Sequence, residues 1–165
     1  MKVLQQLLGF ALLCPFAISC ADQQADVLPI SSSEDHYEEI LTTKNWKLTS
    51  MKAVPAYQDP DSGEYISDLM SYWMDHCEMD DQLIFRMDGS TAAETGEEHC
   101  NVQADIEETG QWKFIFGNSK LQFIDLKGQS IVYDIDKITA HEIQLRSSNL
   151  LNQLSTAKVR FEAVD

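Results

Sequence analysis

Histidine and cysteine are the residues of this chain best suited to chemistry, and four of them form two adjacent pairs. These pairs are His76-Cys77 and His99-Cys100. Two cysteines and two histidines could hold a tetrahedral zinc ion. Against this reading, neighbouring residues on a strand point to opposite faces, and the cysteines lack the close spacing of zinc motifs. A disulfide would also consume both thiolates, so we expect no metal site.

Motifs that identify common catalytic sites are missing from the sequence. It contains no Gly-x-Ser-x-Gly elbow, no metalloprotease helix and no phosphate-binding loop. Asp80, Asp81 and Glu94 are among the carboxylates that could form a glycosidase-like pair in space. Chance would bring acids together in a chain with 27 of them. We therefore expect a protein that is not an enzyme and that uses no cofactor.

The charge balance argues against nucleic acids as partners. The chain carries 12 basic and 27 acidic side chains, for a formal net charge of −15. Phosphate backbones and anionic membrane surfaces both repel such a protein. Attachment to a membrane would therefore have to come from acyl chains.

The N-terminus predicts secretion followed by lipid attachment. Lys2 precedes an apolar run over residues 7–18, which is shorter than the roughly 20 residues that a spanning helix needs. The run ends in Ala17-Ile18-Ser19-Cys20. This ending resembles the lipobox of bacterial lipoproteins, whose cysteine is lipidated and begins the mature protein. Residues 1–19 would then be a signal peptide, and residues 20–32 a lipidated start and tether. The alternative is ordinary cleavage nearby with Cys20 left as a thiol.

The remaining cysteines predict one disulfide. If Cys14 leaves with the signal and Cys20 is acylated, Cys77 and Cys100 are left to pair in an oxidising compartment. A two-residue turn at Asp88-Gly89 would place them opposite each other across an antiparallel ladder. Closing this loop would stabilise the fold by about 3 kcal/mol in the chain-entropy model.

Alternating apolar and polar residues predict an all-β domain over residues 33–165. The clearest stretch is 110–135, where alternation runs between the turns Gly117-Asn118 and Lys127-Gly128. It contains three strands, and five more are expected at residues 45–54, 83–87, 90–95, 138–147 and 158–163. Eight antiparallel strands in hairpin order predict a closed up-and-down barrel, because closure removes exposed strand edges.

Two helices are expected beside the barrel. Ser31 and Glu34 match a capping box that would begin a short N-terminal helix. A second helix is expected between the first two strands, with Ser67 as N-cap. Its apolar face would consist of Ile66, Leu69, Met70, Trp73, Met74 and Cys77. This helix would either close the core or cover a ligand cavity, with flexible methionines adapting to the ligand.

Together these features resemble the lipocalin-like lipoproteins of bacterial envelopes. The resemblance rests on the lipobox-like Cys20, on Trp46 in the first strand, on the segment from Cys77 through Leu83-x-Phe85-x-x-Asp88-Gly89 to Cys100, and on Gly110-x-Trp112. Lipocalins carry glycine two places before the tryptophan, where this chain has Lys44. The resemblance implies a monomeric barrel anchored in the bacterial outer membrane or cell envelope.

An eight-stranded barrel is just wide enough to be filled by side chains or to hold one small ligand. We expect a small apolar or amphipathic ligand, with no metal and no catalytic residues. The predicted lining residues are Trp46, Leu48, Met70, Trp73, Met74, Leu83, Phe85, Phe114, Phe116, Phe123, Tyr133, Leu145 and Phe161. So many large side chains could also fill the interior. The alternative function is then a structural module, or one that binds proteins or glycans.

Overall fold

The computed structural model describes residues 33–100, 105–151 and 154–164. All of them belong to one compact unit, which extends from Ser31 to Asp165. The predicted signal peptide, Cys20 and the tether lie outside the described residues, so what the sequence predicts for them stays a prediction. No helix in the described part of the chain is long and apolar enough to cross a membrane.

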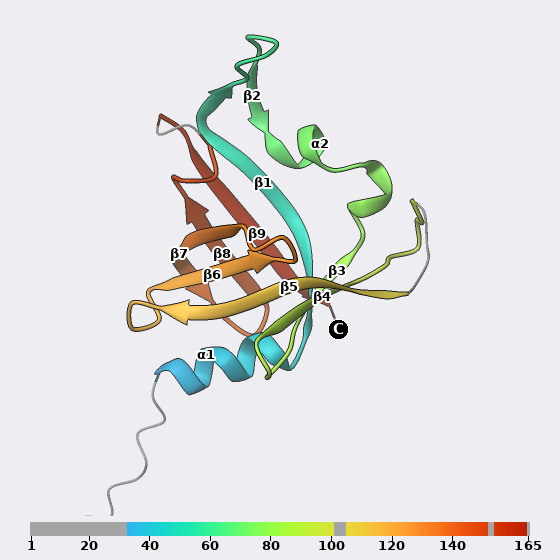
Figure 1. Ribbon diagram of the computed structural model, residues 1–165, viewed down its shortest axis with the longest axis vertical. Coiled ribbons are helices and arrows are strands. Elements are labelled where there is room, and N and C mark those ends of the chain that lie inside the picture. The colour runs from blue at the N-terminus through green and yellow to red at the C-terminus, as the bar shows by residue number, and fades with distance from the viewer. Residues whose placement is uncertain (1–32, 101–104, 152–153, 165) are drawn as a thin grey trace, which may run out of the picture. The chain divides into compact units, whose positions relative to one another are not determined.

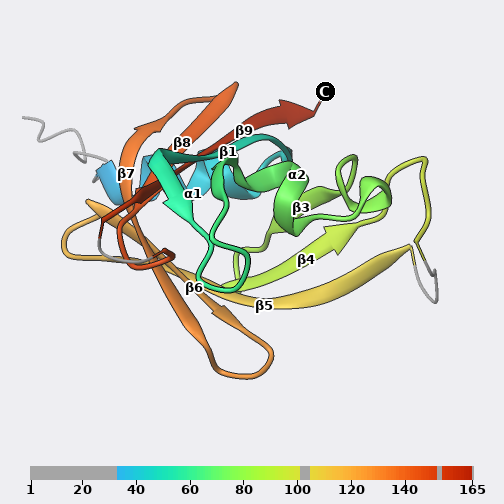
Figure 2. The same ribbon diagram turned by 90° about the horizontal axis from the view of Figure 1, so that it is seen from above.

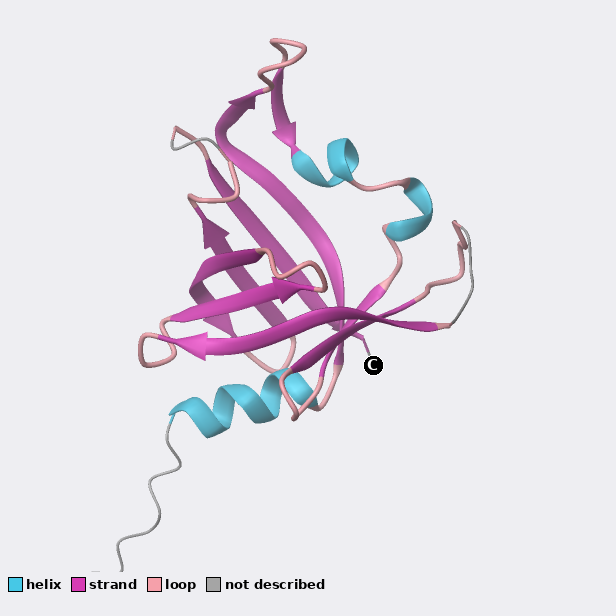
Figure 3. Ribbon diagram, viewed as in Figure 1, coloured by secondary structure: helices cyan, strands magenta, loops and turns pink. Residues whose placement is uncertain are grey.

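The described residues fold mainly into antiparallel strands, shown in Figure 1 and, by type of structure, in Figure 3. Hydrogen bonds join them in the order β2-β1-β3-β4-β5-β6-β7-β8-β9, and β1 also pairs with β9. The strands are β1 (Asn45–Gln58), β2 (Tyr65–Asp68), β3 (Gln82–Phe85), β4 (Ser90–Glu94), β5 (Ile106–Ile115), β6 (Lys120–Asp125), β7 (Ser130–Ile138), β8 (Glu142–Ser147) and β9 (Thr156–Val164). The prediction of a closed, mainly β barrel of eight antiparallel strands is confirmed for β1 and β3 to β9.

Alternation of side chains explains how these strands enclose a core. In β9, Ala157 and Val159 are buried, whereas Lys158 and Arg160, which follow them in alternation, are exposed. In β1 the pairing with β9 shifts between Leu48 and Ser50. A bulge of this kind inserts one residue and resets the alternation.

The ninth strand, β2, was not predicted. It forms a hairpin with the far half of β1, in which Gln58 pairs with Tyr65 and Lys52 with Asp68. The expected long helix from Ile66 to Cys77 is therefore wrong in extent. Only α2 (Leu69–Trp73) and the 3-10 turn η1 (His76–Glu78) are helical. The N-cap of α2 is Asp68 and not Ser67, since the Asp68 carboxylate accepts a hydrogen bond from the Ser71 amide at 3.3 Å.

The N-terminal helix α1 (Ser33–Thr42) lies across the end of the barrel opposite the β1–β2 turn, as Figure 1 shows. Leu41 at its end is buried, and its carbonyl accepts a hydrogen bond from the Trp46 indole N–H at 3.0 Å. The ring of Tyr37 lies 6.2 Å from that of Phe114. These contacts seal this end of the barrel with apolar side chains.

The β3–β4 hairpin has a different register from the one expected. Phe85 pairs with Thr91 and Gln82 with Glu94. The turn contains three residues, Met87 to Gly89, and the Gly89 φ of +82° supplies the left-handed position that such a turn needs. The cysteines therefore do not face each other across this ladder. They are bonded nonetheless, with their Cα atoms 5.2 Å apart, because η1 carries Cys77 toward the segment after β4.

Candidate ligand-binding cavity

An opening in the barrel wall arises from the way β1 is paired. Along one edge, β1 pairs with β3 as far as Lys47, and with β2 only from Lys52 onward. Between these positions no strand pairing is recorded on that edge of β1 among the described residues. The chain from α2 to η1 runs past this opening on the β3 side, away from β6, β7 and β8, as Figure 2 shows.

A cavity of about 330 Å³ lies at this opening. Its apolar wall comes from the inner faces of β1, β3, β4 and β9. On its other side it is covered by Met74 and by side chains that follow α2. The lining residues are Trp46, Leu48, Met74, Glu78, Asp81, Gln82, Leu83, Ala93 and Phe161. A second, smaller cavity of about 190 Å³ shares Leu83 and extends toward Phe123 and Ile131.

Glu78 and Asp81 are the only charged residues that line the larger cavity within the described chain. A Glu78 oxygen accepts a hydrogen bond from the Asp75 amide at 3.0 Å, which closes a capping box around η1. An Asp81 oxygen accepts one from the Gly96 amide at 3.0 Å. A backbone amide therefore fixes the position of each carboxylate.

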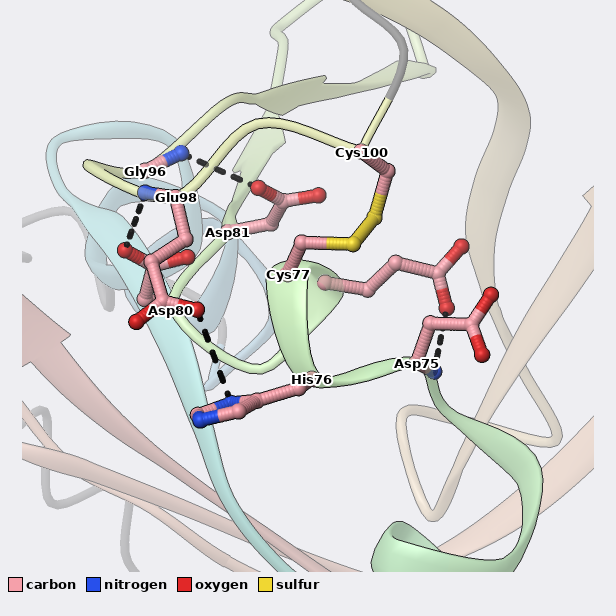
Figure 4. Close-up of a disulfide and its surroundings, with 9 residues drawn as sticks. Asp75, His76, Cys77, Asp80, Asp81, Gly96, Glu98 and Cys100 are labelled. Atoms are coloured by element: carbon pink, nitrogen blue, oxygen red, sulfur yellow. Dashed lines mark hydrogen bonds and ion pairs between the residues drawn. A yellow bond between two sulfur atoms is a disulfide. The ribbon is translucent and has the colours of Figure 1, made fainter.

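The chain from α2 through residue 81 forms the cover of the cavity. The disulfide at Cys77 holds the C-terminal end of this cover (Figure 4). Beside it, the Asp80 carboxylate accepts hydrogen bonds from the Glu97 amide at 2.7 Å and the Glu98 amide at 3.2 Å. The hydrogen bond from the Glu98 amide is the main cause that lowers the pKa of Asp80. A Cβ atom at Gly96 would clash with this carboxylate. The loop after β4 is thereby wrapped closely around residues 77–81.

The other end of the cover is fixed to the β1–β2 turn. Asp59 is only 8% exposed, and its carboxylate accepts hydrogen bonds from the Asp61 amide at 3.0 Å, the Ser62 hydroxyl at 2.8 Å and the Tyr72 hydroxyl at 2.5 Å. The Tyr72 hydrogen bond is the largest cause that lowers the pKa of Asp59, and it raises the pKa of Tyr72 to about 12. The turn is thus organised by its own hydrogen bonds, and α2 is tied to it.

The structure brings five of the predicted lining residues together at the larger cavity: Trp46, Leu48, Met74, Leu83 and Phe161. Phe123 lines the smaller cavity. Three others, Phe85, Tyr133 and Leu145, are buried in the main core, and Phe114 packs against it. Met70 is half-buried, and Trp73 is 44% exposed; neither lines either cavity.

The inward position expected for Phe116 is wrong. β5 ends at Ile115, and Phe116 lies in the following turn with a φ of +54° and 76% of its surface exposed. The alternation of β5 therefore does not extend to this residue.

Sequence reasoning missed four lining residues, Glu78, Asp81, Gln82 and Ala93. Nothing in their types distinguishes them, because acidic residues are common throughout this chain. The spacing of Asp75 and Glu78 was the one available signal, since an acidic residue followed three places later by Glu is typical of a capped helical start. It could have predicted η1 but not the cavity beside it.

In the part of the chain that the structure describes, no group of three or more His, Cys, Asp or Glu side chains is arranged to hold a metal ion. A scan of protein-family models and a search of curated proteins found no match to this chain. The case for a function therefore rests on the barrel, its cavities and the charges around them.

Proposed function

We propose that this protein is a lipid-anchored envelope lipoprotein, similar to lipocalins, whose barrel binds one small apolar or amphipathic molecule. Its target is a small molecule and not a nucleic acid, and it acts as a monomeric carrier or receptor without catalysis. The anchor in this proposal rests on the sequence around Cys20. The proposal of a ligand is supported by the cavity that Met74 and the residues after it cover.

The observation that carries the proposal is the cavity of about 330 Å³, bounded by strands on one side and by Met74 on the other. Pockets that hold small ligands begin at about 300 Å³ and are lined mainly by apolar side chains. The cavity meets both conditions, because most of the residues that line it are apolar, among them Trp46, Leu48 and Phe161. Met74 suits the cover, since its unbranched side chain adapts to molecules of different shape.

A second candidate function is an interaction module without an internal ligand. Exposed aromatic residues on β2 and α2 favour it: Tyr65 is 73% exposed, and Tyr72 and Trp73 are also partly exposed. Aromatic side chains of this kind are enriched at protein interfaces. The first function requires a ligand to bind inside the barrel and the second does not, so a measurement of ligand binding separates them.

The test uses the full-length chain with Cys20→Ala, titrated with 1-decanol by calorimetry below the solubility limit of the alcohol. Binding of one molecule is expected. Leu83→Trp should abolish it, because the larger ring would occupy space in both cavities that Leu83 lines. The matched control is Met87→Trp in the exposed β3–β4 turn, which should bind as the parent does. No binding by the parent, or equal binding by the Leu83 variant, would reject the ligand and leave the interaction module.

The anchor is tested in cells. Wild-type protein should sediment with membranes and should incorporate a labelled fatty acid, whereas Cys20→Ala should do neither and should appear in the soluble envelope fraction. Lipidation adds about 0.8 kcal/mol of membrane affinity per buried methylene, so its loss should release the protein completely. An unchanged distribution of the variant would refute the anchor.

A further inference from the structure

We infer that the ligand is a cationic amphiphile: an apolar chain enters the cavity while a positively charged head group meets Glu78 and Asp81. This inference rests on the proposed function and specifies the class of ligand. The structural basis is the division of the cavity lining into an apolar wall on the barrel and a pair of carboxylates on the cover.

The two carboxylates lie on one short segment, and a different backbone amide holds each of them. Glu78 is the last residue of η1 and is held by the Asp75 amide. Asp81 lies between η1 and β3 and is held by the Gly96 amide. The disulfide at Cys77 and the Asp80 contacts fix the short segment that carries both. A head group at the rim would therefore meet negative charges that need little reorganisation.

Neighbouring basic groups do not neutralise this pair at the cavity. Among the described residues that line it there is no lysine, arginine or histidine. Lys47 acts on Asp80 and helps to lower its pKa, and Asp80 is not part of the lining. His76 at the start of η1 is directed to Glu98, with 3.6 Å between the Nδ1 and the carboxylate. The cavity rim is therefore acidic within an acidic protein.

An anionic amphiphile with the same apolar chain should bind more weakly than a cationic one. A fatty acid would place its carboxylate beside those of Glu78 and Asp81, and like charges in a partly apolar site repel each other strongly. The net charge of −15 acts in the same direction. A cation gains from both effects, because a field of one sign concentrates ions of the opposite sign at a cleft.

The experiment compares three probes with one tail: decyltrimethylammonium, 1-decanol and decanoate, each titrated below its micelle concentration into full-length protein with Cys20→Ala. The cation should bind about tenfold more tightly than the alcohol, which corresponds to about 1.4 kcal/mol, and decanoate more weakly than both. Raising the ionic strength from about 0.01 to about 0.15 M should reduce the preference, since the screening length falls from about 30 to about 8 Å.

Glu78→Gln with Asp81→Asn tests the residues directly. Amide oxygens can still accept the hydrogen bonds from the Asp75 and Gly96 amides, so the fold should be kept. The preference for the cation should fall about tenfold while decanol affinity stays unchanged. The matched control is Glu38→Gln with Glu39→Gln on α1, which removes the same charge from residues that do not line the cavity. This control should keep most of the preference.

The outcomes separate the two levels of the proposal. If decanol binds and the cation binds no better, the acidic rim does not select the head group, and this inference is wrong while the ligand-binding function stands. If the α1 control loses as much preference as the cavity variant, net charge alone is responsible and the inference is again wrong. If none of the three probes binds, the proposed function itself fails.

Discussion

The interior of this barrel is filled in one part and open in another, although neighbouring residues of the same strands line both. Toward α1, aromatic rings pack edge to face: the centroids of Phe85 and Trp112 are 5.3 Å apart, and those of Trp112 and Phe114 are 5.5 Å apart. Toward the β1–β2 hairpin, Leu48 and Leu83 border a cavity of about 330 Å³. The difference cannot come from composition, since both parts are lined mainly by large apolar residues.

Strand pairing explains the difference. Up to Lys47, β1 pairs with β3 on one edge and with β9 on the other, so the wall is continuous there. Past Lys47, this edge of β1 no longer pairs with β3, and its pairing with β2 begins only at Lys52. The short irregular segment between β2 and β3 covers this region without filling it. The path of the segment that connects two strands can therefore create a cavity, even where the strands carry the same types of residue as in the filled part.

Substitutions at Phe85 and Leu83 should give the largest difference in stability between the two parts. These residues lie two positions apart on the same face of β3. Phe85 is 1% exposed and packs against Trp112 and Phe123. Phe85→Ala should lower the free energy of unfolding by about 3–5 kcal/mol, the usual cost of removing a buried aromatic ring. Leu83→Ala should cost at most about 2 kcal/mol, since its surroundings are already partly empty.

Urea unfolding followed by circular dichroism measures both values, and the slopes of the two transitions should agree with that of the parent. Equal losses of stability at the two positions would contradict the division of the interior into a filled and an open part.

The disulfide between Cys77 and Cys100 gives the next largest effect, and beyond the loss of global stability its local effect should be confined to the open part. Cys77→Ser should lower the stability by about 3 kcal/mol in the chain-entropy model for a loop of this size. That loss corresponds to roughly 10 °C in melting temperature for a domain of this length. The Cys100 thiol should become reactive in the variant.

Hydrogen exchange locates this effect. Amides of α2 and η1 should exchange faster in the Cys77 variant, whereas those of β5 and β6 should exchange at nearly the parent rate once global unfolding is subtracted. Cys77→Ser with Cys100→Ser is the control and should match the single variant. Two reactive thiols at these positions in the folded parent would rule out the disulfide.

Much of the filled part could be predicted from sequence, because it depends on local alternation. Phe85, Tyr133 and Leu145 were placed inside the barrel correctly, since inward residues recur every second position along a strand. Phe116 was placed wrongly because alternation does not show where a strand ends. The disulfide was predicted from the cysteine count, but the turn argument offered for it used the wrong register.

The open part was much less predictable because it depends on tertiary pairing. The spacing of Leu69, Met70 and Trp73 is helical, and those residues do form α2. The residues just before them belong to β2 because the far half of β1 offers an edge to pair with, and a local pattern contains no information about that edge. The segment between β2 and β3 brings Glu78 and Asp81 to the cavity. Their residue types alone could therefore not predict that they line it.

The smallest predicted effect concerns the Tyr72–Asp59 hydrogen bond, which ties α2 to the β1–β2 turn. Since the folded state lowers the pKa of Asp59 from 3.8, the stabilisation is present above about pH 4 and is lost as the pH falls below that value. Since the folded state raises the pKa of Tyr72 to about 12, the same bond contributes fully below pH 10 and is lost as the pH approaches 12.

Tyr72→Phe should therefore weaken the pH dependence of stability at both extremes. On the acid side some dependence should remain, because the Asp61 amide and the Ser62 hydroxyl still bind Asp59. On the alkaline side Tyr133 should still contribute, since burial raises its pKa to about 12. Urea midpoints measured from pH 2.5 to 7 give the cleaner comparison, with Tyr65→Phe on exposed β2 as the control. Parallel acid profiles for Tyr72→Phe and the parent would show that α2 is held by the disulfide and its packing, and that the turn contributes nothing to the cover.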